Sequence, residues 1–161
     1  MTAGDTTIDV DLDDVDRAIL RTLQADARTP FSEIARRIDM SSATVHDRVS
    51  RLREAGVIEG YHAKVNPRAV GYGASAFVGL RVEQGRDDAV EAFVDRLRDL
   101  DGVQEIHLTT GDWDLLVEVV AEDTDGLREL LFDAVATTEG FDRSYTMVVL
   151  GTEHDDPTLP F

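Results

Sequence analysis

The chain has 161 residues, 42% of them hydrophobic, and its 33 acidic residues against 16 Lys plus Arg give a formal net charge of −17. This length suits one ordinary domain or two small ones, and the absence of cysteine excludes disulfides, thiolate catalysis and cysteine-bound zinc or iron–sulfur sites. No run of about 18 apolar residues predicts a membrane span, and the acidic N-terminus lacks signal-peptide features, so we expect a cytoplasmic protein.

The kind of charge and its distribution are also informative. Lys64 is the one lysine among the 16 basic residues. This haloarchaeal-like composition is typical of proteins that work in molar salt, where the Debye length falls to about 3 Å and hydrated carboxylates maintain solubility. A second interpretation is an acidic protein that binds basic partners. Residues 61–161 carry 8 basic against 21 acidic residues, but residues 28–53 carry six arginines against three acidic residues, which indicates a polyanion contact there.

The first third of the chain predicts three short helices. The first, over residues 12–28, has apolar residues at helical spacing, and Asp13 with Asp16 has the pattern of a capping pair. The second is expected to begin near Pro30, since proline is tolerated in a first turn. A tight turn then leads to a third helix capped by Ser41. Three such helices predict a helix-turn-helix.

The third helix has an apolar and a polar side. Val45, Val49 and Leu52 recur at i, i+4 and i+7, so we expect them to face a core. Opposite them lie Ala43, Thr44, Asp47, Ser50 and Arg51, with His46 and Arg53 along one edge and Arg48 along the other. The polar side is either an ordinary solvated face or a surface that contacts DNA, and the flanking helices favour DNA.

The segment after the third helix predicts a strand and a linker. Residues 57–65 have the composition of a strand, which would form a small wing. Asn66-Pro67 and the Gly-Tyr-Gly sequence that follows mark a domain boundary. We therefore expect an N-terminal tail over 1–11, a helix-turn-helix domain over 12–60, a strand and linker over 61–73, a second domain over 74–152 and a mobile C-terminal tail over 153–161.

The second domain alternates strands and helices. Strands are predicted over 74–83, 103–110, 114–122 and 142–151, and helices over 87–100 and 123–140. The order βαββαβ is the ferredoxin-like unit, with both helices on one face of the sheet. The predicted fold class is therefore α+β, a winged helix-turn-helix domain followed by a ferredoxin-like domain. The open face of the sheet would need cover, which dimerisation can supply.

The chain resembles the Lrp/AsnC family of feast/famine transcription regulators over about residues 12–152. The resemblance rests on "LDDVDRAILRTLQADAR", on "SEIARRIDMSSATVHDRVSRLREAGVIEGYHAKVNP" and on "TTGDWDLLVEV". It implies an N-terminal helix-turn-helix, a C-terminal ligand-sensing domain, and homodimers that can assemble into tetramers or octamers. Many members have glycine in the turn where this chain has Asp39. Aspartate accepts left-handed geometry better than most residues, so we expect the turn to be kept.

The resemblance implies double-stranded operator DNA as a partner, with the third helix in the major groove. The hydroxyls of Ser41 and Ser42 are expected to contact phosphate at the helix start. Thr44, His46, Asp47, Ser50 and Arg51 are expected to reach bases, and Arg36, Arg37, Arg48 and Arg53 to hold phosphates. Arg51 best matches guanine. Asp47 is costly near phosphate unless it pairs with Arg51 or accepts from cytosine.

A second candidate site is "HLTTGDWDLL", residues 107–116. In the family, the loop between these two strands binds an effector, usually an amino acid, at a subunit interface. Carried over, Gly111 permits close backbone approach, N–H groups from Gly111 to Trp113 hold an α-carboxylate, and Asp114 holds an α-ammonium. The candidate effector residues are His107, Thr109, Gly111, Asp112, Trp113 and Asp114, joined by Thr137, Thr138 and Glu139 from a neighbour. The other interpretation is a plain hairpin with a packed tryptophan.

Two further functions stay open beside the regulator. Sirohaem decarboxylases resemble the family in their two-domain plan, and in that case His107 would be the residue to watch. The third possibility is an architectural DNA-wrapping protein without an effector. The four histidines form no i, i+3 or i, i+4 pair and there is no glycine-rich phosphate loop, so we expect no metal, cofactor or catalytic residue. The polar outer side of the third helix favours the regulator.

Overall fold

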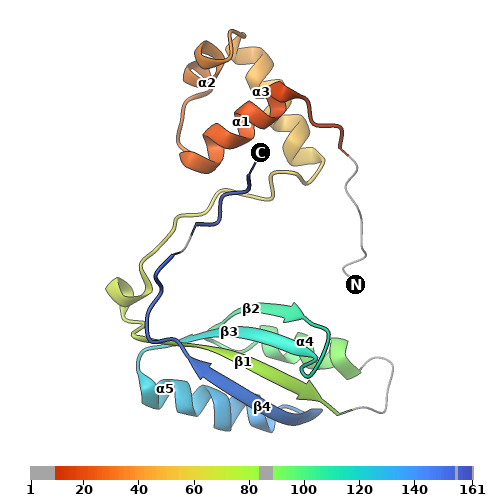
Figure 1. Ribbon diagram of the computed structural model, residues 1–161, viewed down its shortest axis with the longest axis vertical. Helices are drawn as coiled ribbons and strands as arrows, with labels where there is room; N and C mark the ends of the chain where they lie inside the picture. The colour runs from red at the N-terminus through yellow and green to blue at the C-terminus, as the bar shows by residue number, and fades with distance from the viewer. Residues whose placement is uncertain (1–9, 84–88, 155, 161) are drawn as a thin grey trace. The chain divides into compact units, whose positions relative to one another are not determined.

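The structure is a computed structural model in which residues 10–83, 89–154 and 156–160 are described. The chain divides into two compact units, Met1–Ala63 with Asp155–Phe161, and Lys64–His154 (Figure 1). None of the helices in the described ranges is long and apolar enough to cross a membrane. The first two residues of the helix expected over 87–100 lie outside the described residues.

The N-terminal unit contains three helices, α1 (Asp14–Ala25), α2 (Phe31–Arg37) and α3 (Ser42–Glu54). The predicted capping pair forms, because Asp13 accepts from the Asp16 N–H at 2.7 Å and Asp16 accepts from the Asp13 N–H at 3.3 Å. The core consists of one buried stripe from each helix: Ile19 and Leu23, Ile34 and Ala35, Val45 and Val49. The predicted helices and their inward faces are therefore confirmed.

The turn between α2 and α3 has the expected left-handed residue. Asp39 has a φ of 53°. Among the described residues it is the only one other than glycine with a positive φ. The Ser41 side chain then accepts from the Thr44 N–H at 3.1 Å and caps α3. Asp39 therefore adopts the left-handed geometry expected for the turn between α2 and α3.

The strand expected over 57–65 is absent, which corrects the sequence prediction. Residues 57–66 form no helix or strand, and a short 3-10 helix, Pro67–Val70, follows. A strand is stable only when a neighbour pairs with its backbone N–H and C=O groups. Within the described chain no strand lies beside this segment, so its backbone groups have no strand to pair with, despite the strand-like composition.

The C-terminal unit contains a four-stranded antiparallel sheet in the order β2-β3-β1-β4. Its elements are β1 (Ala74–Val82), α4 (Ala89–Arg98), β2 (Val103–Leu108), β3 (Leu115–Ala121), α5 (Thr124–Glu129) and β4 (Phe141–Val148). The predicted βαββαβ order and α+β class are confirmed. The last predicted helix is shorter than expected, since α5 passes into a π-helical turn at Leu130–Ala134 and a 3-10 turn at Val135–Thr137. The wider π-helical turn changes the angle about the helix axis between the side chains of Leu127 and Val135. Both side chains are buried.

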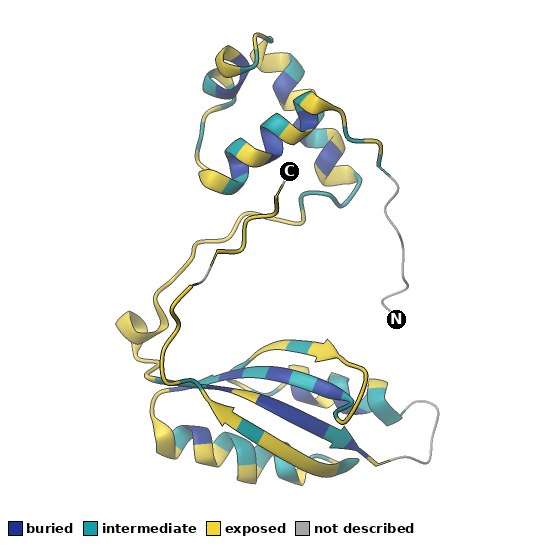
Figure 2. Cartoon of the chain, viewed as in Figure 1, coloured by how far each residue is buried: buried dark blue, intermediate teal, exposed yellow. Residues whose placement is uncertain are grey.

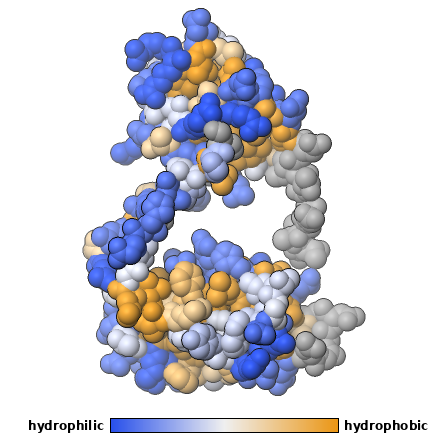
Figure 3. All heavy atoms as spheres, in the orientation of Figure 1, coloured by the Kyte–Doolittle hydropathy of each residue, from blue (hydrophilic) through white to orange (hydrophobic). Residues whose placement is uncertain are grey.

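The two faces of the sheet differ in burial. Figure 2 shows that the central strands β1 and β3 are mostly buried or intermediate, whereas most of β4 is exposed. One face packs against both helices, because alternate residues of β1 and β3, among them Val78 and Val117, share a core with Phe93 of α4 and Leu127 of α5. The other face exposes apolar side chains, and Figure 3 shows hydrophobic residues gathered on this unit. Phe77, Tyr145 and Met147 have relative exposures of 37%, 57% and 43%.

The C-terminal tail makes a contact with the first helix. Residues 156–160 are grouped with the N-terminal unit, and the Leu159 N–H donates to Oε1 of Gln24 on α1 at 2.7 Å. A backbone donor has thus found an amide acceptor on a folded helix, which the tail's polar composition did not indicate.

Candidate DNA interface and effector loop

The start of α3 presents small polar groups around its cap. Ser41, Ser42 and Ala43 are exposed, and the Ser41 hydroxyl lies 2.8 Å from that of Thr44. Ser41 is therefore occupied within the helix start, while the Ser42 hydroxyl has no hydrogen bond in the described chain. Free N–H groups and hydroxyls at a helix start are suited to an anion such as phosphate.

The middle of α3 exposes His46 and Asp47, whose Nδ1 and Oδ1 atoms are 3.6 Å apart. The His46 ring packs edge-on against Phe31 of α2, with 6.0 Å between ring centroids. Phe31 therefore restricts the orientation of the imidazole, although 65% of the His46 side chain stays exposed. Ser50 lies one turn further on and is half-buried.

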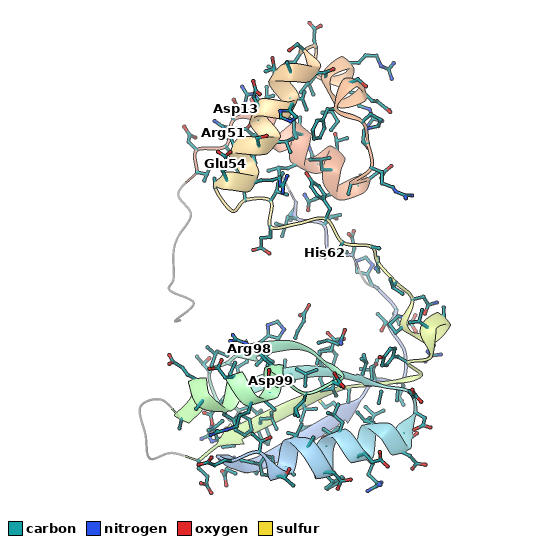
Figure 4. All side chains as sticks on the ribbon, turned by 180° about the vertical axis from the view of Figure 1, so that it is seen from behind. Asp13, Arg51, Glu54, His62, Arg98 and Asp99 are labelled. Atoms are coloured by element: carbon teal, nitrogen blue, oxygen red, sulfur yellow. The ribbon has the colours of Figure 1, made fainter. Side chains whose placement is uncertain are left out.

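Arg48 and Arg51 of α3 are ion-paired with carboxylates at the start of α1, a pairing that the sequence did not predict. Arg48 donates to Asp13 at 2.6 Å and to Asp16 at 2.9 Å, and Arg51 also donates to Asp16. Asp16 is fully buried, at 0% exposure. Figure 4 shows Asp13 and Arg51 close together where the start of α1 meets α3. A buried carboxylate needs such partners, because an unpaired buried charge is very costly.

This ion-pair cluster shifts two pKa values. The Asp16 N–H, and then the Arg48 guanidinium, hold the pKa of the Asp13 carboxyl below its ordinary value. Hydrogen bonds to Asp13 and Asp16 raise the pKa of Arg48. Both shifts favour the charged forms of Asp13 and Arg48, as expected for two groups that form an ion pair.

The remaining candidate arginines differ in their pairing. Arg37 pairs with Glu33 on its own helix at 2.5 Å, an exposed i, i+4 contact. Arg36 and Arg53 are exposed, and within the described ranges no carboxylate pairs with either side chain. The excess positive charge of residues 28–53 is therefore partly neutralised at the start of α1, so few arginines are free to meet phosphate.

The loop between β2 and β3 is fixed by a network from its own hairpin and from β1. The Thr109 N–H donates to the Asp114 carbonyl at 3.0 Å, and the Thr109 hydroxyl donates to the Trp113 carbonyl at 2.7 Å. Gly111 has a φ of 107°, which glycine tolerates, and a Cβ there would meet no atom within 4 Å. Within one chain, Gly111 is therefore required by the turn's conformation, and no close backbone approach is present.

Asp114 has a different setting from the one expected. Its Oδ2 accepts from the Val82 N–H at 2.9 Å, and its Oδ1 lies 3.6 Å from Arg81. The carboxylate expected to be free for an ammonium group therefore joins the loop to β1. Arg81, which the sequence analysis did not select, also donates to the carbonyls of Gly111 and Asp112. Its position as the outward residue near the end of β1 was the available signal.

Trp113 packs on the open face of the sheet. Its ring stacks with Tyr145 of β4 at 6.1 Å, and the Arg143 guanidinium carbon lies 5.2 Å from its centroid. Gly79 of β1 makes room for it, because a Cβ there would lie 2.8 to 3.1 Å from three indole atoms. Trp113 therefore has a fixed orientation beside the loop.

The other predicted effector residues lie apart from the loop network. His107 on β2 is exposed, with Nε2 3.1 Å from Glu105 Oε2. The hydroxyls of Thr137 and Thr138 donate to carbonyls of the preceding helical turn, and Glu139 pairs with Arg96. Among the described residues, no hydrogen bond joins these threonines to residues 107–114.

Comparison with known proteins assigns both units. Residues 75–159 match the family model "Lrp/AsnC ligand binding domain", and residues 12–59 match "Winged helix-turn-helix DNA-binding". The HTH-type transcriptional regulator FL11 of Pyrococcus furiosus is 36% identical over 149 residues, which cover 92% of this chain and 96% of the relative.

Two solved structures show the same fold. The structure of AsnC from E. coli has a TM-score of 0.81 and 30% identity, with 94% of this chain and 98% of that chain covered. The feast or famine regulatory protein Rv3291c from M. tuberculosis, complexed with L-methionine, has a TM-score of 0.84 and 33% identity, with 92% and 99% covered.

Proposed function

Because this chain belongs to the Lrp/AsnC family and is a DNA-binding transcription regulator rather than an enzyme, we propose that α3 reads its operators and that the loop over residues 109–114 binds an amino-acid effector. The observation that carries the proposal is the exposed polar side of α3. Around a capped start it presents Ser42, His46, Asp47 and Arg53.

The proposed DNA interface has a reading and a positioning part. Ser41, Ser42, Thr44, His46, Asp47 and Ser50 lie along the start and exposed side of α3, where a recognition helix reaches base edges and phosphates. Arg36 and Arg53 are free to hold phosphates, and Arg37 would have to share its charge with Glu33. Arg48 and Arg51 can meet DNA only by sharing or leaving Asp16 and Asp13.

This DNA interface can be tested without a known operator. Fragments selected from genomic DNA by the full-length protein should share a motif, and His46→Ala should change that motif. Arg98→Met, on α4 and exposed, is the control. Binding without a shared motif, unaffected by changes on α3, would instead support the architectural function.

The effector proposal rests on the loop geometry and on a relative. Rv3291c is described in complex with L-methionine. In this chain the candidates are His107, Thr109, Gly111, Asp112, Trp113 and Asp114, with Thr137 and Thr138 from a second copy. A thermal-shift screen of the standard amino acids in molar potassium chloride tests the proposal, because a ligand that binds only the native state raises the melting temperature. No shift with any amino acid would contradict it.

We also propose a homodimer formed through the open sheet face, with tetramers or octamers as further assemblies. The face exposes Phe77, Tyr145 and Met147, and apolar patches of this kind are usually covered. Light scattering measures the mass directly, and Met147→Glu should shift it towards the monomer. An unchanged mass would exclude this face.

The remaining proposals concern the cell. The net charge of −17 and the near absence of lysine support a protein adapted to molar salt, working in the cytoplasm where operator DNA is found. Folding at low and molar potassium chloride, followed by circular dichroism, tests the adaptation. A protein equally stable in dilute buffer would contradict it.

A further inference from the structure

Arg81 on β1 is aimed at the backbone of the loop between β2 and β3. Its Nη1 donates to the carbonyl of Gly111 at 3.2 Å and to that of Asp112 at 3.0 Å. The same nitrogen lies 3.6 Å from Asp114 Oδ1. One guanidinium therefore fixes two successive peptide groups, and its own charge is balanced by the neighbouring carboxylate.

This contact sets the direction of the adjacent N–H groups. In a trans peptide the carbonyl of one residue and the N–H of the next point in opposite directions. With the carbonyls of Gly111 and Asp112 turned towards Arg81, the N–H groups of Asp112 and Trp113 point away from it, on a common side. In the described chain neither N–H donates a hydrogen bond, and Gly111 and Asp112 are exposed.

The peptides on either side of this pair are already occupied. The Thr109 N–H donates to the Asp114 carbonyl, and the Asp114 N–H donates to the Leu80 carbonyl at 2.9 Å. The Trp113 carbonyl accepts from the Thr109 hydroxyl. The two unpaired N–H groups are thus held between fixed neighbours, with a cation behind their peptide dipoles. Two neighbouring N–H groups that lie on a common side can both donate to one anion.

We propose that Arg81 is a positioning residue that turns the N–H groups of Asp112 and Trp113 into a receptor for a carboxylate. The proposal rests on the proposed function, since the resemblance already implies that this loop holds the carboxylate of the effector. The new element is the role of Arg81. This role of Arg81 would give a preference for carboxylate ligands a physical cause. Arg81 does not touch the carboxylate, but it orders and polarises the peptides that would, so the site should discriminate a carboxylate from a neutral amide.

Trp113 supplies a direct reporter, because it is the one tryptophan of the chain. Its fluorescence can be followed in the full-length protein while L-methionine or L-methioninamide is added. In the unchanged protein we expect L-methionine to bind at least about tenfold more tightly than its amide, since the amide lacks the charge that the N–H groups bond. In Arg81→Met this preference should fall to about twofold or less as the peptides lose their orientation.

A second measurement is independent of the effector's identity. The constant for quenching of Trp113 fluorescence by iodide, an anion, is divided by the constant for quenching by acrylamide, which is neutral. This ratio should fall in Arg81→Met but stay unchanged in Arg98→Met, which removes the same charge from an exposed pair on α4. A loop that merely loosened would raise quenching by both probes and leave no loss specific to iodide.

Each outcome decides between the proposals. If neither methionine nor any other amino acid changes the fluorescence, while the iodide ratio falls in Arg81→Met and in Arg81→Lys but not in Arg98→Met, the effector function fails and the anion receptor stands. If an amino acid binds and Arg81→Met keeps its preference over the amide, the role of Arg81 is overturned. Arg81→Lys keeps the charge but lacks the forked donors. If Arg81→Lys keeps both the preference for L-methionine over its amide and the iodide-to-acrylamide ratio of the unchanged protein, charge alone suffices and the positioning role is contradicted.

Discussion

Asp16 on α1 and Arg51 on α3 are ion-paired although they lie 35 residues apart in the chain. Asp16 is fully buried and also accepts from Arg48, whereas 53% of the Arg51 side chain stays exposed. The cluster therefore joins the start of α1 to α3, the proposed DNA-reading helix. It leaves Arg51 within reach of the surface.

Asp16→Asn should destabilise the N-terminal unit. The amide keeps the shape and one acceptor oxygen but loses the charge that balances two guanidinium groups, so we expect a loss of about 1–3 kcal/mol in the free energy of unfolding. Chemical denaturation in molar salt measures it. Asp14→Asn, an exposed neighbour in the first turn, is the control, and equal stability of both variants would show that the cluster contributes nothing.

Asp13 should contribute to stability in a pH-dependent way. Its pKa is below the ordinary value of 3.8, so its contribution is fully present above the unfolded pKa and is lost as the pH falls through the folded pKa. Asp13→Asn should therefore have a shallower loss of stability than the unchanged protein below about pH 4. Melting temperatures between neutral and acidic pH test this, and parallel curves for the two proteins would contradict it.

Arg51→Ala should weaken operator binding by about 1–3 kcal/mol and relax the sequence preference if Arg51 contacts a base. Its pairing with Asp16 makes a second explanation possible, namely that it only positions α3. The two differ in the footprint. A base contact predicts loss of preference at one position, whereas a positioning role predicts uniformly weaker binding with the preference kept. Unchanged affinity would remove Arg51 from the interface.

Operator binding should depend only weakly on salt between roughly 0.5 and 2 M potassium chloride, which extends the counterion-release rule beyond its usual range. Ordinary binders lose about 0.9 in log K per phosphate contact for each tenfold rise in salt. In this chain Arg48 and Arg51 are paired with Asp13 and Asp16, so Arg36 and Arg53 are the main free cations among the candidate residues. A steep slope, equal to about six or more released ions, would show that the charge pattern has been misinterpreted.

Gly79→Ala should displace Trp113 from the sheet face. The added Cβ would lie 2.8 Å from the indole Cδ2, closer than such atoms can approach. We expect a shifted Trp113 emission maximum, weaker stacking with Tyr145, and loss of effector response. Gly151→Ala, where a Cβ would meet nothing, is the matched control. An unshifted emission spectrum in Gly79→Ala would show that the ring does not rest on this glycine.

The sequence by itself determined the local elements of both units. Helical spacing of Ile19, Leu23, Val45 and Val49, with caps at Asp13 and Ser41, is enough to specify α1 and α3, because caps and periodicity act within a few residues. Alternation of apolar and mixed residues over 74–83 likewise predicted the strand that forms as β1. The order of the elements then limited the sheet to the βαββαβ topology.

Only the tertiary structure decided which groups meet across long stretches of chain. It paired Arg48 and Arg51 with Asp16, placed Arg81 behind the loop, and gave Asp114 to the Val82 N–H. It also left residues 57–65 without the strand that their composition favours. The physical reason is common to these cases. A charge, a donor or a strand is defined by its partner, and a partner more than 30 residues away has no signature in the local pattern that predicts a helix or a turn.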